Sequence, residues 1–164
     1  MPCFSSFHFV SYSAAQMFAL VADVEQYPKF LFMCEDLIIR ERATQPDCKV
    51  LVTDMVVGYK FAHEKFTTKV FLYEKEKKIE VCYIDGPFKH LENKWQFIDQ
   101  AEGGCLIDFF ITYDFKSKFL GLLMGSMFES TFSKFTSSFV ERAQLLYSSP
   151  EVPLHINSLN KSSL

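Results

Sequence analysis

The sequence offers few side chains that could carry out covalent chemistry. Four histidines, His8, His63, His90 and His155, are candidates for a general base, but none lies in a motif that pairs it with a nucleophile and a carboxylate. No histidines or cysteines have the HxH, HxxxH or CxxC spacing of a metal site. The pattern therefore predicts no catalytic residue, no metal site and no resident cofactor.

Buried carboxylates are the remaining candidates for proton transfer, because burial shifts the pKa of such groups. The candidates on predicted strands are Asp54, Glu64, Glu92 and Asp108. Alternation places Glu92 and Asp108 on the wet face of their strands, whereas Glu64 shares the phase of apolar residues. Glu64 is therefore the best inward carboxylate, although a position at the rim is the favoured interpretation. Asn93 also points inward, to bond a ligand carbonyl or, as the favoured interpretation, to hold a neighbouring backbone.

Composition points to an apolar interior in a single domain. Phe accounts for 19 of the 164 residues, and Phe supplies large apolar area without a polar group. The excess indicates a large core, an apolar cavity or an exposed apolar surface. A net charge of −3 and only three arginines argue against a nucleic-acid-binding protein. Five cysteines, an odd number without CxxC pairs, predict a reduced cytosolic protein with free thiols.

Two periods of hydrophobicity divide the chain into elements that could position an inward-facing site. Alternation with period two predicts strands, and a helix is expected between the first two, where Ser13 and Gln16 form a capping box. The Tyr27–Pro28 step predicts a helix break, and a second short helical turn is expected over 29–33. The strands are expected at 3–10, 36–43, 49–59, 61–73, 78–84, 90–99 and 106–115.

The period returns to 3.6 at Ser117 and predicts one long amphipathic helix of about eight turns. Ser148-Ser149-Pro150 ends it. The order of elements predicts an α+β fold in which a curved antiparallel sheet wraps the long C-terminal helix. One domain is expected over residues 1–148, followed by a flexible tail over 149–164.

A twisted sheet that curls around one helix leaves a space between them, and that space is the expected ligand site. Inward-facing residues of the sheet and of the helix should line it. The predicted ligand-binding residues are Met55, Val57, Phe66, Val70, Tyr83, Leu91, Asn93, Trp95, Phe109, Tyr113, Met124, Met127, Phe128, Phe132 and Phe135.

The segment Phe119–Phe128 is apolar on nearly every side and carries Gly121 and Gly125, each of which costs a helix about 1 kcal/mol relative to Ala. It is far shorter than the roughly 20 residues of a membrane-spanning helix. One interpretation packs it between the sheet and the loops. The other makes it a docking patch at the cavity mouth that contacts a membrane surface transiently, with the glycines allowing close approach of a strand, a ligand or a partner helix.

Four segments, which follow one another in the same order along the chain, resemble the coenzyme Q-binding START-domain family. These segments read YSAAQMFALVADVEQYPKF (12–30), DGPFKHLENKW (85–95), YDFKS (113–117) and ERA (141–143). The resemblance covers residues 5–147. The family also contains bacterial ribosome-association toxins and belongs to the polyketide cyclase/dehydrase-like superfamily. After Phe30-Leu31 the family usually has Pro-Trp-Cys, where this chain has Phe32-Met33-Cys34.

This resemblance implies a helix-grip fold that binds ubiquinone or a similar polyprenyl lipid. The expected role is a lipid chaperone that supports respiratory electron transport without covalent chemistry, in the cytoplasm and peripheral to the inner face of the membrane. Ubiquinone would be the bound ligand rather than a cofactor. Two alternatives stay open: a ribosome-associated inhibitor of translation, and an enzyme of the cyclase/dehydrase type. The oligomeric state also stays open, a homodimer included.

Overall fold

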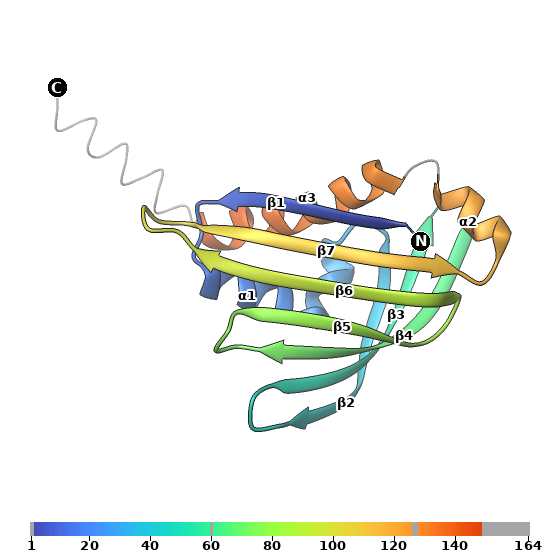
Figure 1. The fold of residues 1–164 in the computed structure, drawn as a ribbon, viewed down its shortest axis with the longest axis horizontal. Coiled ribbons are helices and arrows are strands. Elements are labelled where there is room, and N and C mark those ends of the chain that lie inside the picture. The colour runs from blue at the N-terminus through green and yellow to red at the C-terminus, as the bar shows by residue number, and fades with distance from the viewer. Residues whose placement is uncertain (1, 60, 126–127, 149–164) are drawn as a thin grey trace.

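One antiparallel sheet of seven strands forms the body of the protein, in the order β1-β7-β6-β5-β4-β3-β2. The computed structural model describes residues 2–59, 61–125 and 128–148. Figure 1 shows the sheet strongly curved, with β2 to β4 turned across the direction of β6 and β7. The strands are β1 (Cys3–Val10), β2 (Cys34–Thr44), β3 (Lys49–Tyr59), β4 (Ala62–Tyr73), β5 (Lys78–Asp85), β6 (Phe88–Asp99) and β7 (Cys105–Phe115).

Two helices follow the sheet, α2 (Lys118–Gly125) and α3 (Phe128–Tyr147). The sequence predicts one long helix here, whereas the structure gives two, on either side of residues 126–127, which are outside the described residues. In the view of Figure 1, α3 lies behind β1 and β7. The curved sheet with a C-terminal helix on it confirms the predicted helix-grip architecture.

The first strand is followed by helix α1 (Ala14–Ala22) and a 3₁₀ helix, η1 (Val24–Lys29). The predicted capping box is confirmed, since the Gln16 N–H donates to Ser13 Oγ at 3.1 Å and the Ser13 N–H donates to Gln16 Oε1 at 2.9 Å. The predicted break at Tyr27 and helical turn over 29–33 are wrong, because η1 contains both Tyr27 and Pro28. Tertiary contacts hold this segment: the Tyr27 hydroxyl donates to the Val21 carbonyl, and its ring packs on Phe139.

Aromatic rings join α3 to the concave face of the sheet. Trp95 of β6 lies between Phe109 of β7 and Phe139 of α3, with ring centroids 4.7 Å and 5.0 Å away. Phe109 and Phe139 are almost fully buried. Such edge-to-face packing adds to the stabilisation from burial alone. The layer fixes α3 at one end of the concave face and leaves the other end to the cavity described below.

Candidate ligand-binding cavity

A cavity of about 180 Å³ lies between the concave face of the sheet and helices α2 and α3. Its wall is almost entirely apolar and is built by alternate residues of β3 to β7, which all project to the same side. Ten of the predicted ligand-binding residues line it: Met55, Val57, Phe66, Val70, Leu91, Asn93, Trp95, Tyr113, Phe132 and Phe135.

Two other predicted residues lie nearby without lining the cavity. Phe109 is fully buried behind the Trp95 ring. The Tyr83 hydroxyl accepts a hydrogen bond from the Phe88 N–H at 3.1 Å, and its ring packs against Phe88. These two side chains pack against residues that line the cavity. Met127 and the side chains of Met124 and Phe128, also predicted as site residues, lie outside the described residues.

The polar wall residues that sequence reasoning missed include Thr53 of β3 and Thr68 of β4. Both line the cavity, and they are only 2% and 5% exposed. The strands pair them directly, with the two Oγ1 atoms 3.0 Å apart. Thr53 shares the phase of the predicted residues Met55 and Val57, so alternation alone could have identified it.

Asn93 has a structural role in the wall. Its Nδ2 donates to the Phe110 carbonyl at 2.8 Å, and its Oδ1 accepts from Trp95 Nε1 at 2.9 Å. The side chain therefore holds the neighbouring strand and fixes the plane of the indole ring. This geometry agrees with the favoured interpretation of Asn93.

Glu64 is the only carboxylate among the described lining residues, and no histidine, cysteine, lysine or arginine accompanies it there. The side chain is half-buried near the start of β4, which agrees with both an inward direction and a position at the rim. Proton transfer usually needs a second group within hydrogen-bond reach. The described wall supplies no such ionisable pair.

Burial keeps the Tyr113 hydroxyl and the Cys34 and Cys105 thiols protonated at neutral pH. Burial raises the pKa of Tyr113, in the wall, to about 12, so its phenol remains a neutral hydrogen-bonding group. Burial also raises the pKa of Cys34 and of Cys105 to about 11. All five cysteines are free, as predicted, and none lines the cavity. Across the described residues, no group of three His, Cys, Asp or Glu could hold a metal ion.

One end of the cavity lies between the β3–β4 hairpin and helix α2. Tyr59 and Ala62 of the hairpin line it, as does Leu120 of α2. Outside this ring of residues, Phe61 and Phe119 are 71% and 58% exposed, and Leu122 is 79% exposed. We call Phe61, Phe119 and Leu122 the mouth patch. Within this segment, Phe119 and Leu122 are therefore exposed and Leu120 is buried.

Gly121 of α2 has no described residue close to it. A Cβ atom placed on Gly121 would meet nothing within 4 Å. No helix within the described ranges has the length and apolar character needed to cross a membrane.

Comparison with known proteins places the chain in a family. The model of the family described as "Polyketide cyclase / dehydrase and lipid transport" matches residues 10–140. The chain belongs to this family. Ribosome association toxin RatA of Escherichia coli K12 is 33% identical over 148 residues, 90% of each chain. The mitochondrial coenzyme Q-binding protein COQ10 homolog B of Xenopus laevis is 28% identical, over 88% of this chain and 59% of the relative.

Two solved structures superpose on nearly the whole chain. The 18 kDa protein CC1736 of Caulobacter crescentus has a TM-score of 0.76 at 28% identity, covering 91% of this chain and all of that one. The ZhuI aromatase/cyclase of a Streptomyces species has a TM-score of 0.74 at 12% identity, covering 90% and 98%. At 12% identity, the similarity to ZhuI shows a shared fold and nothing more.

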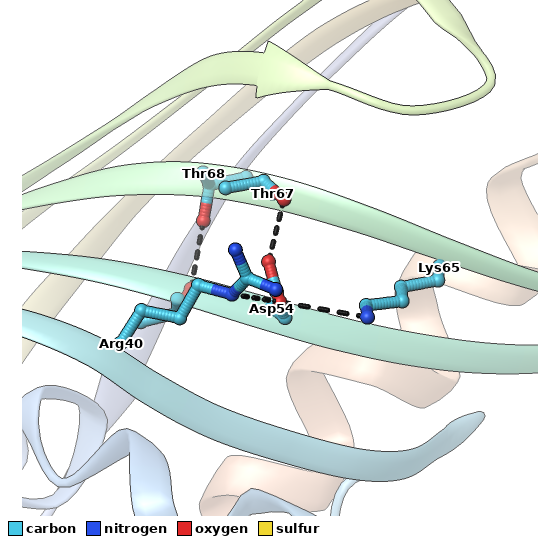
Figure 2. A network of polar contacts seen from close by, with 6 residues as sticks. Arg40, Asp54, Lys65, Thr67 and Thr68 are labelled. Atoms are coloured by element: carbon cyan, nitrogen blue, oxygen red, sulfur yellow. Dashed lines mark hydrogen bonds and ion pairs between the residues drawn. The ribbon is translucent and has the colours of Figure 1, made fainter.

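This member of the cyclase, dehydrase and lipid-transport family also has a buried carboxylate on the outer face of its sheet, away from the cavity. Asp54 of β3 accepts a hydrogen bond from Thr67 at 2.5 Å, forms an ion pair with Arg40 and lies 3.6 Å from Lys65 Nζ. Figure 2 shows these side chains converging on the carboxylate. The hydrogen bond from Thr67 lowers the pKa of Asp54, and the two cations lower it further against the effect of burial. Asp54 is therefore negatively charged and holds the side chains of Arg40 and Lys65 near it.

Proposed function

We propose that the protein binds ubiquinone, or a similar isoprenoid quinone, in this cavity as a lipid chaperone supporting respiratory electron transport. The observation that carries the proposal is the cavity wall, which is apolar throughout except for a few neutral hydroxyl and amide groups and Glu64 near the hairpin. Apolar surface removed from water contributes about 25 cal/mol per Å², which favours a polyprenyl chain over a polar metabolite. The name of the coenzyme Q-binding relative supports the same ligand class.

The proposed role involves no covalent change to the ligand. A cyclase or dehydrase needs groups placed to move protons between substrate atoms. The described wall has one carboxylate and no partner for it. Binding and release of an unchanged lipid require only apolar contact, which the wall supplies, and a path of entry.

Entry would take place at the membrane surface, through the mouth patch. A cavity of about 180 Å³ is smaller than the roughly 300–1,000 Å³ typical of sites for drug-sized ligands, so a long isoprenoid tail requires the mouth to widen or the tail to project through it. Lys116 and Lys118 are exposed and come just before Phe119 of the mouth patch in the sequence. Each basic side chain near an anionic bilayer contributes about 1 kcal/mol of attraction. The protein would therefore act in the cytoplasm, peripheral to the inner face of the membrane.

Mass spectrometry of an organic extract tests this function. The protein, purified without detergent and then incubated with ubiquinone vesicles and re-isolated, should yield ubiquinone in a fixed ratio to protein. Val81→Phe, which adds bulk inside the cavity, should yield much less. An extract without any quinone or other lipid, before and after incubation, would contradict the proposal.

Ribosome association is the second candidate, favoured by the 33% identity with the toxin named for it. The outer face offers a surface for it, because Arg40 and Lys65 are more than half exposed and are held in place by Asp54. Phosphate contacts from such side chains make binding fall with salt. Sedimentation with ribosomal subunits, for wild type and Arg40→Ala/Lys65→Ala, tests this candidate. Loss of cosedimentation in the variant would support it, and an absence of cosedimentation by the wild type at low salt would contradict it.

A further inference from the structure

We propose that the Thr53–Thr68 hydroxyl pair recognises the carbonyl oxygen of the bound ligand, so that the quinone ring enters first and the tail points to the mouth. This inference rests on the proposed function and deepens it, since it assigns a place and an orientation to the head group.

The two threonine hydroxyls keep one hydrogen that can be donated to a ligand. Each threonine hydroxyl carries one hydrogen, and the 3.0 Å bond between the two Oγ1 atoms uses one of the two. Among the described residues, neither hydroxyl has a second hydrogen-bond partner. The remaining hydrogen belongs to a group that lines the cavity, where a carbonyl oxygen can accept it.

Stability alone does not require these hydroxyls. Thr53 and Thr68 lie in an apolar wall, with Met55 and Phe66 as the next inward pair on one side and Leu51 and Val70 on the other. Replacing both partners of a buried hydrogen bond by apolar groups of the same shape is close to neutral for folding. Two valines would fill this position, so the presence of two hydroxyls points to recognition.

The position of the pair fixes the direction of the ligand. Thr53 precedes Tyr59, at the hairpin end of the cavity, by six residues in β3. At about 3.3 Å per residue, the pair lies roughly 20 Å along the strand from that end. The wall between them includes Met55 and Val57. A ring bonded to the pair would therefore leave the remainder of this apolar path for the first isoprene units.

The inference predicts selectivity for apolar ligands that carry a carbonyl group, such as quinones and ketones, over hydrocarbons of the same shape. Removing the donor leaves the ligand carbonyl without a partner in an apolar site. Loss of one neutral hydrogen bond of this kind weakens binding by up to about tenfold.

Trp95 provides the measurement, since it is the only tryptophan and lines the cavity. A quinone in contact with the indole quenches its fluorescence. The probe is a ubiquinone with two isoprene units, titrated into wild type, Thr53→Val/Thr68→Val and Thr53→Ser/Thr68→Ser. The valine variant should bind about tenfold more weakly, and the serine variant, which keeps both hydroxyls, should bind close to the wild-type level.

A second probe separates recognition from shape. Geranylbenzene has the same tail and no carbonyl, and its affinity follows from displacement of the quinone. It should bind wild type and the valine variant equally. Equal quinone affinity in wild type and valine variant would overturn the inference, as would parallel weakening of both probes. A wild type that binds neither probe would instead contradict the proposed function itself.

An infrared measurement requires no variant and covers the case in which the valine variant does not fold. The carbonyl stretch of the bound quinone, labelled with ¹³C, should lie at lower frequency than in hexane. Carbonyl bands at the hexane frequency would overturn the inference.

Discussion

The ring of Phe61, between β3 and β4, lies 6.2 Å from the ring of Phe119 in α2, although both side chains are more than half exposed. The two rings join the hairpin to the helix outside the cavity mouth. This contact makes the mouth patch a continuous apolar surface that spans two elements, which is the feature that the proposed membrane contact uses.

Charges in the mouth patch should weaken membrane contact. Phe61→Asp/Phe119→Asp removes apolar area and adds two negative charges beside an anionic surface, so binding to phosphatidylglycerol-containing vesicles should fall at least tenfold. Thermal stability should change little, because exposed substitutions usually cost less than about 0.5 kcal/mol. Flotation of vesicles with bound protein measures the effect.

Phe7→Asp is the matched control for that experiment. Phe7 is 68% exposed, as exposed as the mouth residues, but it lies on β1, outside the mouth. The control should bind vesicles like wild type. Equal losses in both variants would show that general hydrophobicity, rather than the mouth patch, determines binding.

Bulk inside the cavity should displace ligand without disturbing the fold. Val81→Phe places a ring in a space of about 180 Å³, whereas Val52→Phe adds the same ring on the opposite face of the sheet, where Val52 pairs with Lys69. Quinone recovered per protein should fall severalfold for the first variant and stay at the wild-type level for the second. Similar recovery from both variants would mean that the ligand binds elsewhere.

Thr67→Val should remove a pH-dependent part of the stability. Folding lowers the pKa of Asp54, chiefly through the bond from Thr67, so the folded state holds fewer protons than the unfolded chain. This contribution is present above the unfolded pKa of about 3.9 and is lost as the pH falls through the folded value. The variant should lose about 2 kcal/mol at pH 7, and less at pH 2, in urea unfolding.

Thr44→Val, at an exposed strand end, serves as the control for Thr67→Val. Its free energy of unfolding should stay within about 0.5 kcal/mol of wild type at both pH values. A Thr67→Val loss that does not diminish at low pH would contradict the assigned role of the Asp54 carboxylate.

Two glycine substitutions should act in opposite directions. Gly121→Ala fills open space in a helix and should stabilise the protein by up to about 1 kcal/mol. Gly104→Ala meets the Val10 carbonyl at 2.3 Å in a residue with φ of +74°, and should destabilise it by about 2 kcal/mol or more. Thermal denaturation compares them. If Gly121→Ala also abolished vesicle binding, close backbone approach at that turn would be required after all.

The seven strands were predictable within about two residues because alternation is a local property of the chain. The depth of each side chain was not: Phe109 has the inward phase of a wall residue but lies behind Trp95, a fact of packing between elements. Thr68 alternates with the wall residues Phe66 and Val70 but was not assigned to the site, because a small hydroxyl gives a weak hydrophobic signal. The 3₁₀ helix at Pro28 depends on the distant Phe139, which local propensity cannot include.

The pairing of β1 with β7 also sets the order in which the chain can assemble. Phe7 pairs with Asp108, about a hundred residues later, while every other neighbouring pair of strands is consecutive in sequence. At a synthesis rate of about 5–20 residues per second, the first strand waits several seconds for its partner. During that time Phe4, Phe7 and Phe9 are without the strand that flanks them in the finished sheet. Strand β1 is therefore the last of the seven strands to be paired, and it is where a nascent molecule is most exposed to aggregation or to capture by a chaperone.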